Sequence, residues 1–279
     1  MLKFSSLLLL LLWSNLTFAV DSCQTTNGAI TDSNANCYAE PQEYYTTIYK
    51  LGLCTSRPTA PTSNTAVDLS SCTTVFENTS GMKVKIVKGT PTKLTGTVTR
   101  PPNGTYTYAI ALVGPEFELK TILTFASPAR SNYPASGSAS TGSVCWSRAG
   151  TFYSNRSAWI ADLVDCGSSV GSSYGLMKSR VNALDGDGQG NSIMTRDFGT
   201  MTGYMLTAAN KLASSGAGTM GTVDKILAVL PSTSVVKSTS TKLDISFSIT
   251  QGTTVEMNNM GTAIEAFGVG PFFPVITVD

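Results

Sequence analysis

Hydrophobic and polar residues alternate through a long stretch of the chain, residues 94–125. The apolar positions are Tyr106, Tyr108, Ile110, Leu112, Phe117, Leu119, Leu123 and Phe125, and the positions between them include Thr105, Thr107, Ala109, Ala111, Glu116, Glu118 and Lys120. A period of two residues is typical of strands with one buried face. The Pro-Pro-Asn-Gly sequence at 101–104 supplies a turn between two such strands. The pattern therefore predicts a β-meander at the centre of an all-β domain.

Other runs predict further strands, at residues 72–77, 82–88, 223–230, 243–250 and 255–257. Residues 43–55 fit either a strand or a helix. Their β-branched residues favour a strand, whose single face would carry Tyr45, Thr47, Tyr49, Leu51 and Leu53. Residues 200–213 are predicted as a short helix, although Gly203 weakens it. The apolar positions of that helix are Met201, Met205, Leu206, Ala209 and Leu212.

The order of these runs predicts an antiparallel β-sandwich, Ig-like or jelly-roll-like, that is split by an insertion. Residues 20–126 form its N-terminal part and residues 223–279 its C-terminal strands. Residues 127–222 are rich in Gly and Ser and form a long elaboration between the two parts. Residues 1–19 read as a secretory signal peptide, with Lys3 before a short apolar core and a small-residue cleavage site that ends at Ala19. The mature chain contains no apolar run of the roughly 20 residues that a membrane span needs.

The amino-acid composition narrows the range of functions that the sequence suggests. Without Lys3 the mature chain has as many basic as acidic residues, so nothing in its charge favours nucleic acid or an anionic membrane. Ser and Thr make up 71 of the 279 residues, so hydroxyl groups supply most of the surface polarity. The 42% hydrophobic content argues for a real core rather than a disordered chain.

Six cysteines occur as three neighbouring pairs. Export favours disulfides, and the even count leaves none over. The pairing of nearest neighbours gives Cys23–Cys37, Cys54–Cys72 and Cys145–Cys166, although six cysteines allow fifteen pairings. Each of these loops would stabilise the fold by about 3 kcal/mol by restricting the unfolded chain. Zinc is the competing interpretation, but there is no CxxC sequence and no histidine.

The absence of histidine also removes the common catalytic sets. Ser-His-Asp and Cys-His catalysis need it, and it is the most frequent general base near neutral pH. A pair of carboxylates, as in glycosidases, is the remaining option. The candidates are Asp162 with Asp165 and Glu116 with Glu118, and no motif supports either pair. We therefore expect a protein that is not an enzyme.

A possible calcium site lies in residues 185–191, Asp-Gly-Asp-Gly-Gln-Gly-Asn. Oxygen-bearing side chains stand at the first, third, fifth and seventh positions, which are Asp185, Asp187, Gln189 and Asn191, as in the first half of an EF-hand loop. Arg196 occupies the twelfth position, where an EF-hand has its bidentate Glu. The same sequence is also typical of an ordinary turn without an ion.

The segment between Cys145 and Cys166 is expected to form a disulfide-closed hairpin. Trp146, Tyr153 and Trp159 could form a platform on which sugar rings stack. The competing interpretation, which we prefer, is that these rings fill a small core.

Together these features predict an exported structural protein of a cell or particle surface, secreted or periplasmic, that forms a fimbria-like filament or another extracellular assembly. In general composition the chain resembles pilin-like and surface-layer proteins. This resemblance assigns no role to any particular residue. The apolar C-terminal run at 263–279, from Ala263 to Asp279, is suited to pairing with the sheet edge of another subunit or surface protein. The alternatives are a secreted adhesin or glycan-binding module, with or without calcium, and a virion-associated surface protein.

Overall fold

The computed structural model describes residues 22–31, 37–87, 92–131, 141–151, 164–181, 191–196, 199–213, 222–257 and 263–279. These residues form strands and loops, with no α-helix among them, so the prediction of an all-β protein is confirmed. The strands are β1 Thr25–Thr26, β2 Ala29–Ile30, β3 Cys37–Ala39, β4 Glu43–Cys54, β5 Cys72–Ile86, β6 Thr97–Val98, β7 Gly104–Lys120, β8 Ile122–Ser131, β9 Thr141–Ser147, β10 Gly150–Thr151, β11 Val164–Gly167, β12 Met177–Arg180, β13 Asn191–Arg196, β14 Gly199–Leu206, β15 Lys225–Val236, β16 Leu243–Ser248, β17 Thr253–Met257, β18 Ala263–Val269 and β19 Phe273–Val278.

The strands form two large sheets and one small one. The nine-stranded sheet has the order β13-β14-β15-β7-β4-β5-β6, with β12 also paired to β7 and β10 paired to β12. The eight-stranded sheet has the order β1-β2-β8-β18-β17-β3, with β9 paired to β8 and β11 paired to β9. Strands β16 and β19 form a separate two-stranded antiparallel sheet, which we call the ribbon.

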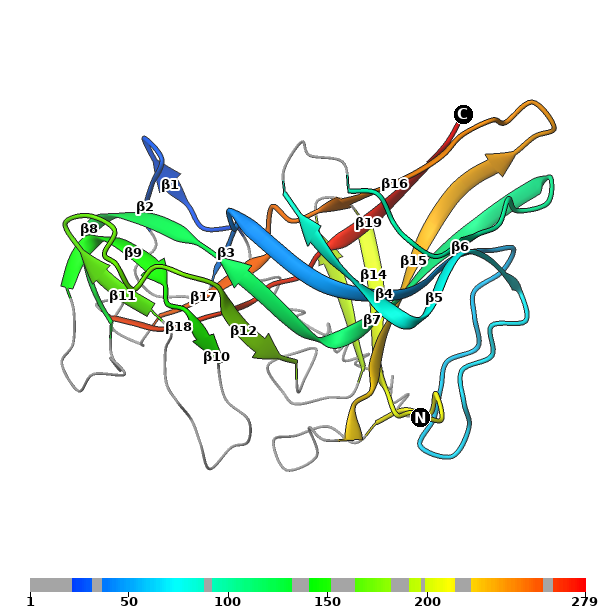
Figure 1. Ribbon diagram of the computed structural model, residues 1–279, viewed down its shortest axis with the longest axis horizontal. Helices are drawn as coiled ribbons and strands as arrows, with labels where there is room; N and C mark the ends of the chain where they lie inside the picture. Colours follow the sequence, from blue (N-terminus) through cyan, green and yellow to red (C-terminus); the bar gives the residue numbers. More distant parts are fainter. Residues whose placement is uncertain are drawn as a thin grey trace, which may run out of the picture.

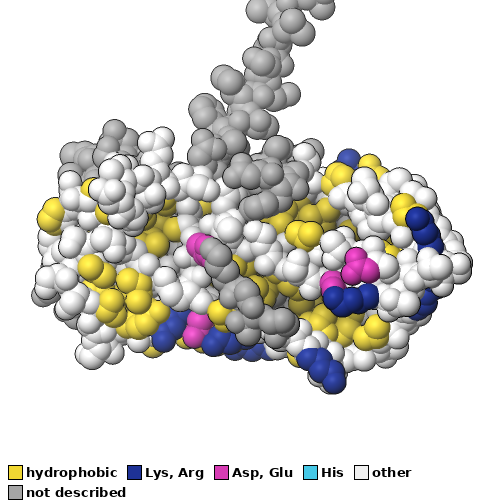
Figure 2. Space-filling view, turned by 90° about the horizontal axis from the view of Figure 1, so that it is seen from above, with side chains coloured by type: hydrophobic (Ala, Val, Ile, Leu, Met, Phe, Trp, Pro, Cys, Tyr) yellow, Lys and Arg dark blue, Asp and Glu magenta, His cyan; other side chains and the backbone are white. Residues whose placement is uncertain are grey.

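The molecule is elongated, and its two ends differ (Figure 1). The eight-stranded sheet lies at the end drawn on the left, where β8, β9, β11 and β18 are labelled. The far parts of β7 and β15, together with the ribbon, lie at the end drawn on the right, which we call the distal end. The surface seen from above is mainly backbone, uncharged polar side chains and hydrophobic groups, with few charged side chains among them (Figure 2).

Two hydrophobic clusters lie on opposite faces of β7. The main core contains Tyr106, Ala111 and Phe117 together with residues of both large sheets. The smaller cluster contains Ile110 with Tyr204 and Leu227 of the neighbouring strands, and is covered by loop residues that include Val67, Leu69 and Leu212. The middle of β7 is therefore buried on both faces.

The predicted meander is wrong in its connections. Strand β6 pairs with β5 and not with β7, and the neighbours of β7 are β4, β15 and β12. Strand β8 belongs to the other large sheet, so the chain changes layers at Thr121. The backbone N–H of Thr121 donates to Ser147 Oγ at 3.0 Å, so this buried backbone group has a partner at the crossing. The predicted outward face of β7 is also wrong, because Ala109 and Ala111 face the main core.

Strand β4 confirms the choice of strand over helix but not the predicted face. Its register against both neighbours shifts between Ile48 and Lys50, which marks a β-bulge. One extra residue moves all later side chains to the other face. Tyr44 and Ile48 before the bulge and Leu51 after it therefore share the main core, each fully buried.

The three disulfides join Cys23 to Cys37, Cys54 to Cys72, and Cys145 to Cys166, as the sequence predicts. Cys145 and Cys166 stand opposite each other where β9 pairs antiparallel with β11, so the base of the predicted hairpin is confirmed. The residues between β10 and β11 lie outside the described part.

Residues 127–222 contribute strands to both large sheets. Strands β9 and β11 belong to the eight-stranded sheet, and β12, β13 and β14 belong to the nine-stranded sheet. The predicted helix at 200–213 is wrong, because β14 runs through Gly199–Leu206 and pairs with β13 and β15. Pairing on both sides overrides the helical spacing of its apolar residues.

Candidate functional site

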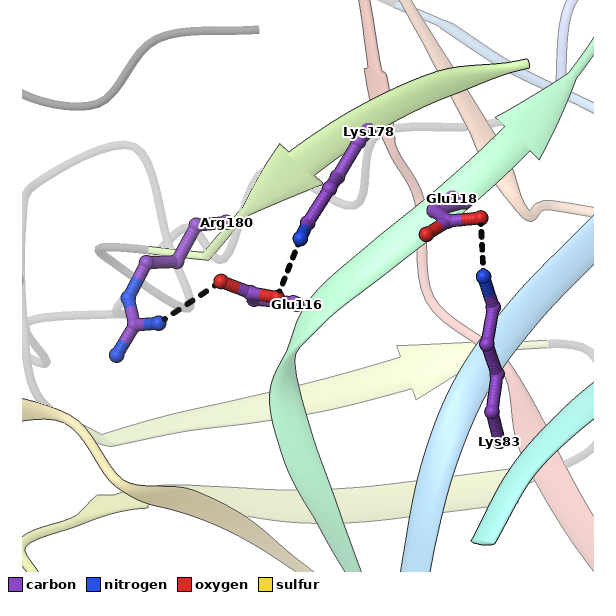
Figure 3. Close-up of polar contacts among 5 residues, drawn as sticks. All are labelled: Lys83, Glu116, Glu118, Lys178 and Arg180. Carbon is purple, nitrogen blue, oxygen red and sulfur yellow. Dashed lines mark hydrogen bonds and ion pairs between the residues drawn. The ribbon is translucent and has the colours of Figure 1, made fainter. Parts of the chain in front are cut away.

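A charged face covers the outside of the nine-stranded sheet where β5, β4, β7 and β12 lie side by side (Figure 3). Glu118 of β7 pairs with Lys83 of β5, with Nζ and Oε2 2.6 Å apart. Glu116 of β7 pairs with both basic residues of β12, at 2.8 Å from Lys178 Nζ and 3.3 Å from Arg180 Nη1. The face is therefore a ladder of cross-strand ion pairs.

This geometry does not fit the Glu116–Glu118 pair as an acid–base pair. The hydrogen bond from Lys178, with smaller contributions from the charges of Lys178 and Arg180, lowers the pKa of Glu116. A hydrolase of this type needs one carboxyl group with a raised pKa, so that it can donate a proton near neutral pH. Glu116 is held as a carboxylate, and Glu118 faces Lys83 rather than an apolar pocket.

Asp165, the described member of the other carboxylate pair, belongs to a structural network. Its Oδ2 accepts a hydrogen bond from Ser173 Oγ at 2.5 Å and lies 3.2 Å from Arg148 Nε. Ser173 Oγ in turn accepts a hydrogen bond from Trp146 Nε1 at 2.9 Å. The network fixes residues near Ser173 over Trp146. The second carboxylate of the pair, Asp162, lies outside the described residues.

Trp146 is only 5% exposed. Its ring packs so closely on Gly171 that a Cβ added there would lie 2.8 Å from a ring carbon. The ring therefore fills the space beneath the loop, as the core interpretation expects of this residue. Tyr153 and Trp159 lie outside the described residues, so the platform of three aromatic rings stays a prediction.

The predicted calcium loop also falls mostly outside the described residues. Asp185, Asp187 and Gln189 are not among them, and only the backbone of Asn191, the first residue of β13, is described, opposite Tyr204. In the described parts of the chain, no three His, Cys, Asp or Glu residues are grouped so that they could hold a metal ion. Calcium binding stays a prediction.

The C-terminal run, 263–279, divides into two strands with different surroundings. Strand β18 is internal to the eight-stranded sheet, where Ile264 and Phe267 are fully buried. Strand β19 pairs with β16 in the ribbon, from Leu243 opposite Val278 to Ser248 opposite Phe273. The sequence predicts that the whole run pairs with another subunit as one segment. Among the described strands, only its second half, β19, has an open edge.

The ribbon continues the β17–β18 pair across a close backbone contact. The N–H of Gly270 donates to the carbonyl of Gly252 at 2.9 Å, and a Cβ added at Gly270 would lie 1.9 Å from Gln251 O. A glycine is therefore required at this junction. The hydroxyl group of Tyr44, whose pKa burial raises, donates to Gly270 O at 3.1 Å. The rings of Tyr44, Phe117, Phe247 and Phe272 pack together beside it, with centroids 5.7–5.9 Å apart.

The two faces of the ribbon differ. One face turns toward the main core, and its Leu243, Ile245, Phe247, Ile276 and Val278 are only partly buried there. The other face carries Asp244, Ser246, Val275 and Thr277. By contrast, Val255, Ile264 and Phe267 in the β17–β18 pair have no exposed surface. The ribbon thus covers the distal end incompletely.

A groove of about 490 Å³ runs between the ribbon and β15. Residues 233–235 of β15 line one side, residues 276–279 line the other, and Lys237, Thr239 and Ser240 also contribute. Strand β14 pairs with β15 only as far as Val229, so this part of β15 has no partner on that side among the described strands. Val235 on the β15 side of the groove is 44% exposed, and Val275, which precedes the lining residues of β19, is 42% exposed.

The sequence predicts a contact surface in the C-terminal run but does not predict the groove. One side of the groove is formed by residues 233–235 of β15, which lie beyond the strand that the sequence predicts at residues 223–230. The available signal is the Pro-Ser-Thr-Ser sequence at 231–234, where β15 changes register against β7. Proline residues and β-bulges are typical of edge strands, which lack a regular hydrogen-bonded partner on one side.

Comparisons with family models and curated proteins, and with solved structures, find no match. Within the described residues, no helix has the length and apolar character needed to cross a membrane.

Proposed function

We propose that this protein is an exported, non-enzymatic structural subunit, built on a β-sandwich, that assembles with other subunits at a cell or particle surface. The observation that carries the proposal is the ribbon at the distal end. Its apolar face is only partly buried, and its β19 edge opens into a groove between two unpaired strand edges.

Incomplete burial of large apolar side chains favours association. Burial of apolar area contributes about 25 cal/mol per Å². Five aliphatic or aromatic residues on the inner face of the ribbon retain exposed surface in this chain, whereas Val255 of β17 and Ile264 and Phe267 of β18 have none. A strand added beside β19 would cover this surface and also satisfy the backbone groups of the open edge.

The remaining features support the extracellular part of the proposal. Three disulfides are typical of an oxidising compartment. A neutral surface with few charges and many hydroxyl groups does not repel a second copy of itself. The best-placed carboxylate pair is held in ion pairs, which leaves it unsuited to acid–base chemistry.

The proposal is tested on the mature chain, residues 20–279, by sedimentation velocity over a concentration series and by negative-stain microscopy. We expect oligomers or filaments that grow with concentration. Particles of monomer size at every concentration would contradict the proposal. Deletion of residues 263–279 is not a useful test, because it would remove the buried β18 and unfold the protein.

A sharper test replaces Val275 by Lys. A charged residue at this exposed position should leave the fold intact but disfavour an added strand, as lysines do on natural edges. The matched control is Val98→Lys, because Val98 is 71% exposed on β6 at the opposite side of the nine-stranded sheet. We expect Val275→Lys to reduce association at least tenfold and Val98→Lys to leave it unchanged. Equal effects of the two variants would argue against the ribbon as the contact.

A further inference from the structure

We infer that β19 pairs antiparallel with β19 of a second copy across a two-fold axis, so that two ribbons join into one four-stranded sheet. This inference rests on the proposed function, because it names the partner and the contact for that assembly. The juxtaposition that carries it is the open β19 edge facing the unpaired part of β15 across the groove.

The β19 edge lacks the protection found on the other long edge. Strand β5 carries Lys83 and Lys85, and segment 92–95 contacts it. The side chain of Asn78 donates to Thr95 O at 2.9 Å, and Thr92 Oγ1 donates to Lys85 O at 2.8 Å. Strand β19 has no charged residue from Phe273 to Val278. Charged residues and covering segments are how proteins block edge pairing, so β19 is the more available edge.

A second copy fits this edge because the edge is complementary to itself. Two copies related by a two-fold axis present the same surface to each other, and neutral side chains meet without repulsion between like charges. The nearest charges on the ribbon, Lys242 and Asp244, pair with each other. The charged residues that line the groove, Lys237 and Asp279, have opposite signs. The groove therefore has no excess of one charge that would favour a strongly basic or acidic partner.

The faces of the ribbon fix the register of this pairing. Directly opposite residues of an antiparallel pair lie on the same face of the sheet. The apolar and polar faces of the two ribbons therefore stay separate only in registers that place inner-face residues opposite inner-face residues. With Ile276 on the axis, the Ile276 side chains of the two copies meet on the inner face. Val275 of each copy then stands opposite Thr277 of the other on the outer face. Pro274 has no N–H to donate, which limits the pairing toward the start of the strand.

The size of the contact predicts how tightly it holds. Stable protein interfaces bury about 800 Å² on each partner, and a few paired residues of one edge bury less than this. Val235, which belongs to β15 on the other side of the groove, extends the contact beyond the ribbon. We therefore expect association that depends on concentration, as suits subunits that meet on a crowded surface.

Cross-linking of the full mature chain tests the pairing. Val275→Cys and Thr277→Cys are prepared separately, because both positions are exposed. We expect the mixture of the two, under mild oxidation, to form covalent dimers at least fivefold faster than either variant alone. The control mixes Ser246→Cys with Thr277→Cys, because Ser246 lies on the outer face of β16, one strand away from the β19 edge. Circular dichroism checks that every variant keeps the native fold.

The outcomes separate this inference from the proposed function. Rapid dimer formation by the Val275→Cys and Thr277→Cys mixture alone supports the two-fold pairing. Assembly seen by sedimentation, with no preference for that mixture over the control, overturns the pairing and leaves the assembly proposal standing. The absence of both assembly and cross-links overturns both. If a variant misfolds, Ile276→Cys replaces it, because the pairing places the two copies of that residue opposite each other on the axis.

Discussion

The two antiparallel pairs at the C-terminal end of the chain, β17–β18 and β16–β19, are one continuous arrangement with two different environments. In the first pair Val255, Ile264 and Phe267 are sealed between the large sheets. In the second pair the residues at equivalent inward positions remain partly exposed, and neither strand has a second partner among the described strands. The same alternating pattern therefore builds a closed core in one region and an unfinished layer in the other. The difference lies in what covers each pair and not in the strands themselves.

The largest expected effect separates the two regions by stability. Phe267→Ala removes a ring with no exposed surface and should lower the free energy of unfolding by about 3–5 kcal/mol. Ile276→Ala in the ribbon should cost about 1 kcal/mol, because the side chain is only partly buried and solvent can fill the space. Urea unfolding of dilute protein measures both. Similar costs for the two variants would mean that the ribbon is packed as tightly as the core.

An intermediate effect is expected at the junction between the two pairs. Gly270→Ala places a Cβ 1.9 Å from Gln251 O, so the backbone must shift, and we expect a loss of about 1–3 kcal/mol. Gly268→Ala is the matched control in β18, because its added Cβ would meet only ordinary contacts at 3.5 Å or more. Thermal unfolding compares the two. A control variant that is as unstable as Gly270→Ala would show that the close contact is not the cause.

The smallest expected effect concerns the ion pairs. Because Lys178 lowers the pKa of Glu116, this carboxylate stabilises the fold above its unfolded pKa, and the contribution is lost as the pH falls through the lower folded pKa. Glu116 is 47% exposed, so the contribution is about 0.5 kcal/mol or less. Glu116→Gln should be slightly less stable than the native protein at pH 7 and equally stable near pH 3. Asp244→Asn, on the more exposed Lys242–Asp244 pair of the ribbon, should show no measurable difference. A stability gap for Glu116→Gln that persists at pH 3 would argue against the ion pairs as its source.

The features that could be predicted from the sequence are those that depend on residues close together in the chain. The all-β class, the strand at Glu43–Cys54 and the disulfide pairing follow from local alternation and local cysteine spacing. The partners of β7, the bulge after Ile48 and the strand at Gly199–Leu206 depend on residues far away in the chain. The candidate site shows the same division. The apolar C-terminal run was recognised, but its division at Gly270 and its position beside β15 arise only from tertiary contacts.

The position of β7 between β4 and β15 also sets the order in which the protein can fold. Strand β4 precedes β7 closely, but β15 is separated from it by most of the second half of the chain. Closing such long loops makes folding slow, because the entropy of closure is lost before the contacts form. As the chain is synthesised, β12 can pair with residues 116–119 of β7 first, whereas residues 104–113 have no partner on that side until β15 has appeared. The central strand is among the first long strands made and among the last to be completed.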